Sequence, residues 1–282
     1  YVYATESTRN VPIMKSKDLV EWTYCNTAFT NKTRPRFEPK AGIWAPDINY
    51  INGKYVLYYA MSVWGGEQTC GIGVATADSP QGPFTDHGKM FRSNEIGVQN
   101  SIDPSLLQYE GRNYLVWGSF RGIYVIELTA DGLSIMPGAK KKRIAGTAFE
   151  AVYIHKHGDY YYMFASIGSC CQGVKSTYKV VVGRSKKVWG PYKDKTGKPM
   201  LKNGYSLVIG ANDHFVGNGH GSQIIQDDAG QDWLLYHGFS RSTPENGRIL
   251  LLDQIKWDQE GWPYVEGGSP SYETQKAPVF NN

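Results

Sequence analysis

The sequence predicts an all-β fold made of repeated units. Its 282 residues combine 20 Tyr, 10 Phe and 8 Trp with 32 Gly and 14 Pro, a composition typical of short strands joined by tight turns. No apolar run approaches the ~18 residues of a membrane-spanning helix. The net charge of +4 is small and dispersed. Disordered, coiled-coil, helical-bundle and membrane proteins are therefore excluded, and neither nucleic acid nor an anionic membrane is expected as a partner.

One pattern recurs four times along the chain. It consists of a strand, a turn that contains glycine, and a second strand rich in aromatic residues, and it occupies residues 51–60, 109–118, 156–165 and 228–237. The turn glycines are Gly53, Gly111, Gly158 and Gly230. Each is expected to take the positive φ that a tight hairpin requires.

A second pattern follows the first one. Residues 73–84 closely match residues 182–192, and residues 12–22 are a looser copy. Each unit therefore contains about four short strands, which is the blade of a β-propeller. Tyr1-Val-Tyr-Ala4 aligns with Leu57-Tyr-Tyr-Ala60, so a fifth unit begins without its innermost strand and first turn. We predict one five-bladed propeller domain over residues 1–282, N-terminally incomplete, whose first blade lacks its innermost strand in this chain.

Polar residues recur where the innermost strand of each blade precedes its turn glycine. Asp103 and Glu150 both stand eight residues before that glycine, and Asp47 and His220 occupy comparable places. Because innermost strands line the axis of a propeller, these side chains are expected to converge. Converging carboxylates suit proton transfer or cation binding. The alternative is a strand-end turn or cap, which we favour for Asp47 because Pro-Asp is a common turn former.

Glycoside hydrolysis is the chemistry that best matches carboxylates around an open pocket. One carboxylic acid protonates the leaving oxygen and a second carboxylate activates water. Aromatic side chains at the rim would offer flat faces to sugar rings, with core packing as the alternative for each; these are Trp44, Trp64, Phe120 and Tyr178.

Two further features leave alternatives open. The adjacent Cys170 and Cys171 are expected to be two small packed thiols, with a vicinal disulfide or a place in the wall of the site as the other interpretations. His237 follows an aromatic strand and is expected to be a packed histidine.

Several motifs together resemble glycoside hydrolase family 43, and within it the endo-α-1,5-L-arabinanase branch. The resemblance covers residues 1 to about 265. It is carried by Trp-Ala-Pro-Asp (44–47), Ser-Pro-Gln-Gly-Pro-Phe (79–84), Ile-Asp-Pro-Ser (102–105), Gly-Ser-Phe (118–120), Phe-Glu-Ala (149–151), Val-Gly-Arg-Ser (182–185), Gly-Pro-Tyr (190–192), Gly-Asn-Gly-His-Gly-Ser (217–222) and Leu-Tyr-His (235–237). The most specific stretch is Ser-Cys-Cys-Gln-Gly-Val-Lys-Ser-Thr-Tyr at 169–178.

The resemblance implies a five-bladed propeller that hydrolyses its substrate with inversion. Glu150 matches the general acid, and Asp103 matches the aspartate that tunes the pKa of this acid and orients it. His220 matches the histidine near a central metal, often calcium with a largely aqueous shell; Asp47 or Asp213 could complete such a site. The general base of the family is an aspartate on the innermost strand of the first blade, and it is expected upstream of Tyr1.

The resemblance also implies the substrate. It points to an inverting glycosidase that cleaves α-1,5-linked L-arabinofuranose chains internally, with arabinoxylan as a further polysaccharide. The expected substrate-binding residues are Trp44, Asp47, Phe120, Cys170 and Tyr178. Two alternatives remain: an exo-acting α-L-arabinofuranosidase or β-xylosidase of the same family, and a carbohydrate-binding propeller without catalysis, motivated by the missing base. A monomer and an extracellular or periplasmic location are expected, since polymeric substrates are met outside the cytoplasm.

Overall fold

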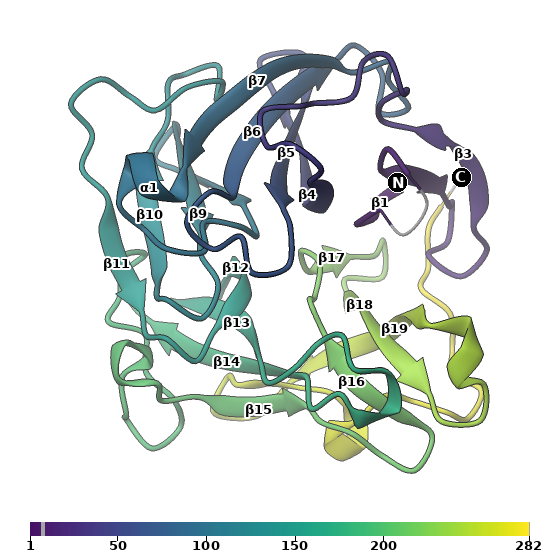
Figure 1. Cartoon of the computed structure of the whole chain (residues 1–282). Coiled ribbons are helices and arrows are strands. Elements are labelled where there is room, and N and C mark those ends of the chain that lie inside the picture. Colours follow the sequence, from purple (N-terminus) through teal and green to yellow (C-terminus); the bar gives the residue numbers. More distant parts are fainter. Residues whose placement is uncertain (7–8, 282) are drawn as a thin grey trace. The chain divides into compact units, whose positions relative to one another are not determined.

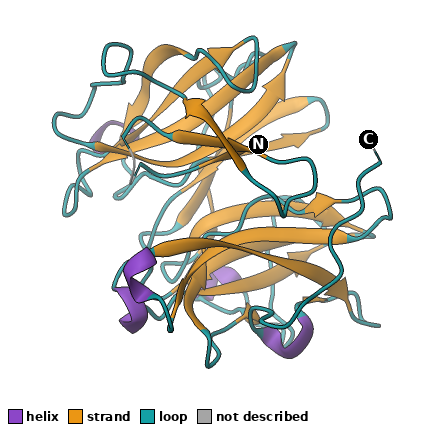
Figure 2. Cartoon of the chain, turned by 90° about the vertical axis from the view of Figure 1, so that its right-hand side faces the viewer, coloured by secondary structure: helices purple, strands orange, loops and turns teal. Residues whose placement is uncertain are grey.

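β-strands dominate the computed structural model, which describes residues 1–6 and 9–281 (Figure 2). The Cα positions group into two units: unit 1 is Tyr1–Ser16 with Trp22–Arg143, and unit 2 is Lys17–Glu21 with Ile144–Asn282. The single domain expected over residues 1–282 stays a prediction. Helical elements in the described chain are short, and none has the length and apolar composition needed to cross a bilayer. They are α1 (Ser93–Ile96), η1 (Gly173–Lys175), η2 (Met200–Lys202), η3 (Pro244–Asn246) and η4 (Glu266–Gly268).

Unit 1 holds three antiparallel sheets among its described residues (Figure 1). The first is β1 (Val2–Tyr3), β2 (Pro12–Lys15) and β3 (Thr23–Thr27). The second is β4 (Gly42–Ile51), β5 (Lys54–Ser62), β6 (Gly71–Ala77) and β7 (Thr85–Arg92). The third is β8 (Ser105–Tyr109), β9 (Arg112–Trp117), β10 (Ile123–Glu127) and β11 (Lys142–Ala145), whose last two residues pass the boundary of the unit.

Unit 2 holds two further antiparallel sheets among the residues described. One is β12 (Glu150–His157), β13 (Tyr160–Ile167), β14 (Lys179–Ser185) and β15 (Ser206–Ile209). The other is β16 (Phe215–Gly219), β18 (Asp232–Ser240), β19 (Arg248–Trp257) and β20 (Pro263–Tyr264), with β17 (Ile225–Gln226) paired to β18.

The first sheet differs from the other four in its strand count. Each of the other sheets begins with a strand that precedes a turn glycine, namely β4, β8, β12 and β16. In the first sheet the order is β1-β2-β3 along the described residues, and β1 corresponds to the second strand of the other blades. The predicted first blade without its innermost strand in this chain is therefore confirmed.

The repeated turns have the backbone that the sequence predicts. Gly53, Gly111, Gly158 and Gly230 have φ values of 82°, 72°, 52° and 77°. Three of the hairpins are two-residue turns, because Ile51 pairs with Lys54 and equivalent pairs close the next two. A side chain at these glycines would be forced into the left-handed region, so glycine fixes the length of each turn.

The second pattern also repeats in three dimensions. Gly82-Pro83 and Gly190-Pro191 are both cis peptide bonds. The aromatic residues that follow, Phe84 and Tyr192, are 3% and 0% exposed. The two matching sequences therefore have matching backbones, each of which buries an aromatic ring under its own sheet.

The cores lie between neighbouring sheets within each unit. In unit 1, one cluster includes Phe29, Leu57 and Tyr59, and a second includes Trp117 and its neighbours from two sheets. In unit 2, a cluster around Tyr236 joins residues of both sheets. Within each unit, neighbouring sheets therefore bury apolar faces against each other, and this packing helps to hold the innermost strands.

Candidate active site

Glu150 is the first residue of β12 and lies at a break in the strand ladder. Glu150 pairs with Ser166, but the next pair is Tyr153 with Phe164, so two residues of β12 lie in a bulge. Ala151, inside this bulge, has a φ of 52°. A bulge rotates the side chain before it away from the regular alternation of a strand. The Glu150 side chain is thereby re-aimed while its strand stays paired.

Similar irregularities occur at the other predicted site residues. The register of β4 shifts between Trp44 and Asp47, with a φ of 45° at Ala45 between them. Asp103 has a φ of 56°, two residues ahead of β8. His220 follows β16 directly with a φ of 53°. Backbone that departs from the regular strand is therefore a shared property of these positions.

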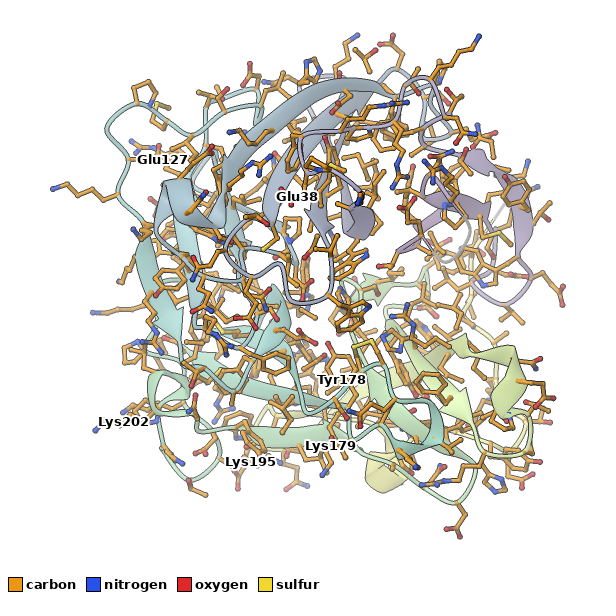
Figure 3. All side chains as sticks on the ribbon, viewed as in Figure 1. Glu38, Glu127, Tyr178, Lys179, Lys195 and Lys202 are labelled. Atoms are coloured by element: carbon orange, nitrogen blue, oxygen red, sulfur yellow. A yellow bond between two sulfur atoms is a disulfide. The ribbon has the colours of Figure 1, made fainter. Side chains whose placement is uncertain are left out.

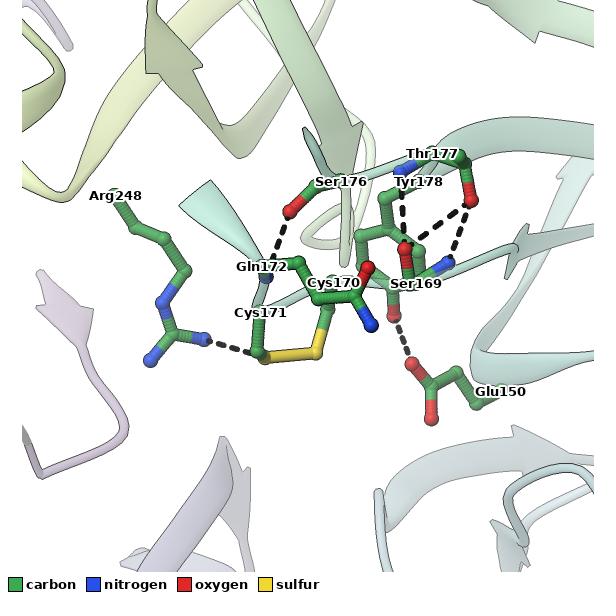
Figure 4. The surroundings of a disulfide bond; sticks show 9 residues. All are labelled: Glu150, Ser169, Cys170, Cys171, Gln172, Ser176, Thr177, Tyr178 and Arg248. Carbon is green, nitrogen blue, oxygen red and sulfur yellow. Dashed lines mark hydrogen bonds between the residues drawn. A yellow bond between two sulfur atoms is a disulfide. The ribbon is translucent and has the colours of Figure 1, made fainter. Parts of the chain in front are cut away.

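In unit 2, Tyr178 holds Glu150. The Tyr178 hydroxyl donates to Oε1 of Glu150 at 2.5 Å (Figure 4). The tyrosine ring stacks on His237 at a centroid distance of 5.7 Å, and a Cβ at Gly219 would come within 2.3 Å of Cδ1 of this ring. The ring is 1% exposed, in contrast to the rim position expected of it. This geometry makes Tyr178 a positioning residue for Glu150 and not a flat surface for a sugar.

Tyr178 ends the loop that begins at Ser169. The backbone N–H groups of Thr177 and Tyr178 both donate to the Ser169 carbonyl at 3.1 Å, which closes the loop at its base. Figure 3 labels Tyr178 away from Lys195 and Lys202, which are exposed at the periphery of unit 2. The closed loop therefore fixes the position of Tyr178, which directly precedes β14.

Cys170 and Cys171 form a disulfide with each other, so the packed thiols that the sequence favoured are not found (Figure 4). Spacing alone could not decide between thiols and disulfide, because adjacent cysteines permit both. Cys171 is exposed and Cys170 is partly exposed. Arg248 Nη1 lies 4.0 Å from Sγ of Cys171. The disulfide thus stands on the same loop as Tyr178, with a cationic side chain beside it.

His220 and His237 lie close together in unit 2. His220 donates its backbone N–H to Oγ of Ser166 at 2.9 Å, and its ring lies 6.4 Å from that of His237. Burial lowers the pKa of His220, and the Glu150 carboxylate opposes this effect. Burial, His220 and Arg248 hold the pKa of His237 well below its ordinary value. Both imidazoles are therefore neutral at neutral pH.

The residues around His220 offer few donors for a calcium ion. Among the described residues, the group of three or more metal-ligating side chains lies elsewhere, at His155, His157 and Asp232. Calcium takes six to eight oxygen ligands. A single imidazole does not supply that donor set, so the residues at His220 do not build a protein-ligated calcium site.

Asp47 and Asp103 lie in unit 1. Oδ2 of Asp47 accepts hydrogen bonds from the backbone N–H of Leu106 at 2.8 Å and from Asn49 Nδ2 at 2.7 Å, which ties β4 to β8. This arrangement matches the turn-and-cap role that we favoured for Asp47. Asp103 is 7% exposed and follows Ser101, whose Oγ accepts from Trp117 Nε1 at 3.0 Å. A buried carboxylate next to a hydrogen-bonded Ser101 has a fixed position, which suits a residue that orients another group.

The three aromatic residues of unit 1 that were predicted to line the rim are more accessible than Tyr178. Trp64 is 78% exposed and its ring lies 5.4 Å from that of Trp44, which is partly buried. Phe120 is partly buried with a φ of 52°. Trp64 and Trp44 therefore present an accessible aromatic surface, and their role in binding sugar rings stays a prediction.

Sequence reasoning missed two residues of the unit 2 site. Ser166 accepts from His220 and Arg248 approaches the disulfide, yet neither belongs to the strand ends on which the argument was built. The pairing of Ser166 with Glu150 across the hairpin was a usable signal for the serine. No comparable signal marks Arg248, which is 77 positions from its contact.

Comparison with known proteins bears on the fold and the family. The family model described as "Glycosyl hydrolases family 43" matches residues 1–263. An extracellular exo-α-(1→5)-L-arabinofuranosidase of Cellvibrio japonicus is 36% identical over 94% of this chain and 82% of its own length. An extracellular endo-α-(1→5)-L-arabinanase of Bacillus subtilis is 37% identical over 90% of this chain and 80% of its own length.

Solved structures agree with these relatives. The Cellvibrio cellulosa α-L-arabinanase complexed with arabinohexaose has a TM-score of 0.84 at 34% identity, covering 94% of this chain and 90% of that one. The native Bacillus subtilis arabinanase has a TM-score of 0.78 at 32% identity, covering 93% and 92%. With the five sheets, this similarity confirms the predicted five-bladed β-propeller. The chain therefore belongs to glycosyl hydrolase family 43 and is a glycosidase.

Proposed function

We propose that this glycosidase hydrolyses α-1,5-linked L-arabinan with inversion, cutting within the chain. The observation that carries the proposal is the buried Glu150 carboxyl, re-aimed by its bulge and held by the Tyr178 hydroxyl at 2.5 Å. A carboxyl held in one orientation can deliver a proton to a glycosidic oxygen. The arabinan substrate is supported by the names of the relatives and by the arabinohexaose bound to one of them.

Exo action is the second candidate, and a specific observation favours it. The Cellvibrio japonicus relative, at 36% identity, is named as exo-acting. The two modes give different products from the same polymer. Linear arabinan yields a ladder of short oligosaccharides under endo action, whereas exo action releases small products from chain ends only.

The general base is proposed to stand on residues that precede Tyr1 in the natural protein. The family pattern places it on the innermost strand of the first blade, and in this chain the first sheet has three strands among the described residues. Asp103 is proposed to orient Glu150 and tune its acidity. Activity is therefore best assayed in a form that carries the natural residues upstream of Tyr1.

Several finer points are proposals as well. Any cation at His220 is proposed to be a hydrated one, bound through a single imidazole nitrogen, with calcium as the ion to titrate. An extracellular or periplasmic location is supported by the relatives, two of which are named extracellular. Arabinoxylan as a substrate and a monomeric state stay predictions.

The test is product analysis on linear α-1,5-arabinan with the wild type and Glu150→Gln. Since general acid catalysis contributes about 10²- to 10⁴-fold, we expect kcat to fall at least about 100-fold with binding of arabino-oligosaccharides retained. Glu266→Gln is the matched control, because Glu266 is exposed and pairs with Lys256 at 2.9 Å. Unchanged turnover in Glu150→Gln would refute the acid assignment. Binding without hydrolysis by the wild-type extended form would instead favour the non-catalytic alternative.

A further inference from the structure

Unit 2 carries a cluster of metal-ligating side chains outside the catalytic residues. His155 and His157 stand on β12, and Asp232 is the first residue of β18. One ligand atom from each of the three lies within 4.8 Å of the others. The two histidines are two positions apart on a strand, so both side chains point to the same face of the sheet. We propose that these three residues form a site for a first-row divalent transition metal such as Zn²⁺.

The donor separations are close to those of a bound metal. His157 Nδ1 lies 3.8 Å from Oδ2 of Asp232. Metal bonds of about 2.1 Å in tetrahedral geometry place neighbouring donors about 3.4 Å apart. The measured pair is about 0.4 Å wider than this separation, and all three donors lie within 4.8 Å of one another, so the cluster has to contract only slightly to hold an ion.

Neighbouring groups already orient two of the three ligands. The Trp257 indole stacks on His157 at a centroid distance of 3.7 Å and an interplanar angle of 7°. The same indole donates Nε1–H to Oδ2 of Asp232 at 2.7 Å, and Gln226 Nε2 donates to Oδ1 at 3.2 Å. Partners of this kind fix the rotamers of metal ligands and raise affinity. Trp257 therefore orients both the His157 ring and the Asp232 carboxylate.

The charge of the cluster favours a cation. Asp232 is 5% exposed, and in the described part of the chain the basic side chain within 4 Å of its carboxylate is His157. A divalent ion would neutralise this buried carboxylate. Two imidazole nitrogens and one carboxylate oxygen suit Zn²⁺, Ni²⁺ or Cu²⁺, whereas Ca²⁺ and Mg²⁺ prefer oxygen ligands throughout.

The cluster is separate from the catalytic acid. Glu150 begins β12 and His157 ends it, so about 3.3 Å per residue places them roughly 20 Å apart along one strand. Asp232 lies on the other sheet of unit 2 (Figure 1). A metal bound here would cross-link the two sheets of the unit and would stabilise the fold without taking part in hydrolysis.

The test is metal titration of the whole chain with ZnCl₂, followed by thermal unfolding and calorimetry. Because a ligand that binds only the folded state stabilises it, we expect Zn²⁺ in large excess over its Kd to raise the Tm by roughly 3 °C or more, and CaCl₂ to give a smaller shift. His157→Gln should weaken Zn²⁺ binding at least about 10-fold and remove most of the Tm shift. Asp232→Asn, which keeps the shape of the side chain, should do the same.

The controls separate this site from other histidines. His87→Gln changes an exposed histidine of unit 1 and should leave the Zn²⁺ response as in the wild type. Circular dichroism verifies that each variant is folded before metal is added. If Zn²⁺ changes neither the Tm of the wild type nor its calorimetric trace, the proposal is overturned. An equal Zn²⁺ response in wild type, His157→Gln and Asp232→Asn also overturns it, since the ion would then bind elsewhere.

Discussion

Replacing Tyr178 by phenylalanine removes one hydroxyl from beneath the general acid. The ring stays in place, because it is held by stacking on His237 and by the close approach of Gly219. The lost interaction is the 2.5 Å hydrogen bond to Oε1 of Glu150. Hydrogen bonds to charged groups contribute about 1.5–3 kcal/mol. If this energy holds the acid in its productive orientation, kcat falls about 10- to 100-fold, at 1.36 kcal/mol per factor of ten.

The assay is the pH dependence of kcat and KM on linear arabinan. The hydroxyl donates more strongly to a carboxylate than to a carboxylic acid, so its loss favours the protonated acid and should move the alkaline limb of the profile to higher pH. KM should change little. Tyr192→Phe is the control: Tyr192 is equally buried in unit 2, but its hydroxyl donates to the Val188 carbonyl. Full kcat and an unmoved alkaline limb in Tyr178→Phe would refute the reasoning.

Three further predictions concern stability, its pH dependence and packing. The buried Arg34 guanidinium pairs with Glu6, so Arg34→Met should cost about 3–5 kcal/mol, against less than about 1 kcal/mol for Lys54→Met in an exposed pair, as measured by denaturant unfolding. Burial alone would raise the pKa of Glu6, but Arg34 and backbone N–H donors more than offset this effect and lower the pKa. The stabilisation of the fold by the Arg34–Glu6 pair is therefore present above about pH 4.3, the pKa of the unfolded state. It should be lost as the pH falls through the lower pKa of the folded state. Gly219→Ala would push a Cβ into the ring of Tyr178, so both activity and stability should fall. Gly210→Ala, whose Cβ would meet its nearest atom at 3.5 Å, should leave kcat unchanged. Equal kinetics for the two alanine variants would count against this packing.

The fold was predictable because its signals are local and repeat. A turn glycine between two strands is a short-range hairpin signal, and four copies with positive φ at Gly53, Gly111, Gly158 and Gly230 establish the period. The three-stranded first sheet followed from aligning the chain start with the second strand of the next unit. The hairpins and the three-stranded first sheet can both be inferred from short sequence segments, because the blades of a propeller repeat.

The contacts within the site were less accessible to sequence reasoning. Register counting placed Glu150 and His220 at strand ends, but the role of Tyr178 depends on a loop that returns 28 residues later to the same carboxyl. Arg248 approaches Cys171 from a different sheet. The first contact depends on the path of a loop within one blade and the second on how two blades pack, and a single sequence contains no periodic signal for either. The same reason hid the cluster of His155, His157 and Asp232, whose members come from two blades.

Backbone strain connects the repeat to the site. Ala45, Asp103, Ala151 and His220 all have φ values between 45° and 56°, although none is glycine. Each such residue costs about 1 kcal/mol or more, and a fold selected for stability alone would favour glycine there. The strain persists because each position belongs to, or adjoins, an innermost strand whose ladder and packing hold the rest of its backbone. The repeat thus supplies a rigid frame, and the irregular residues within it give functional side chains such as Glu150 an orientation that the regular alternation of a strand would not give them.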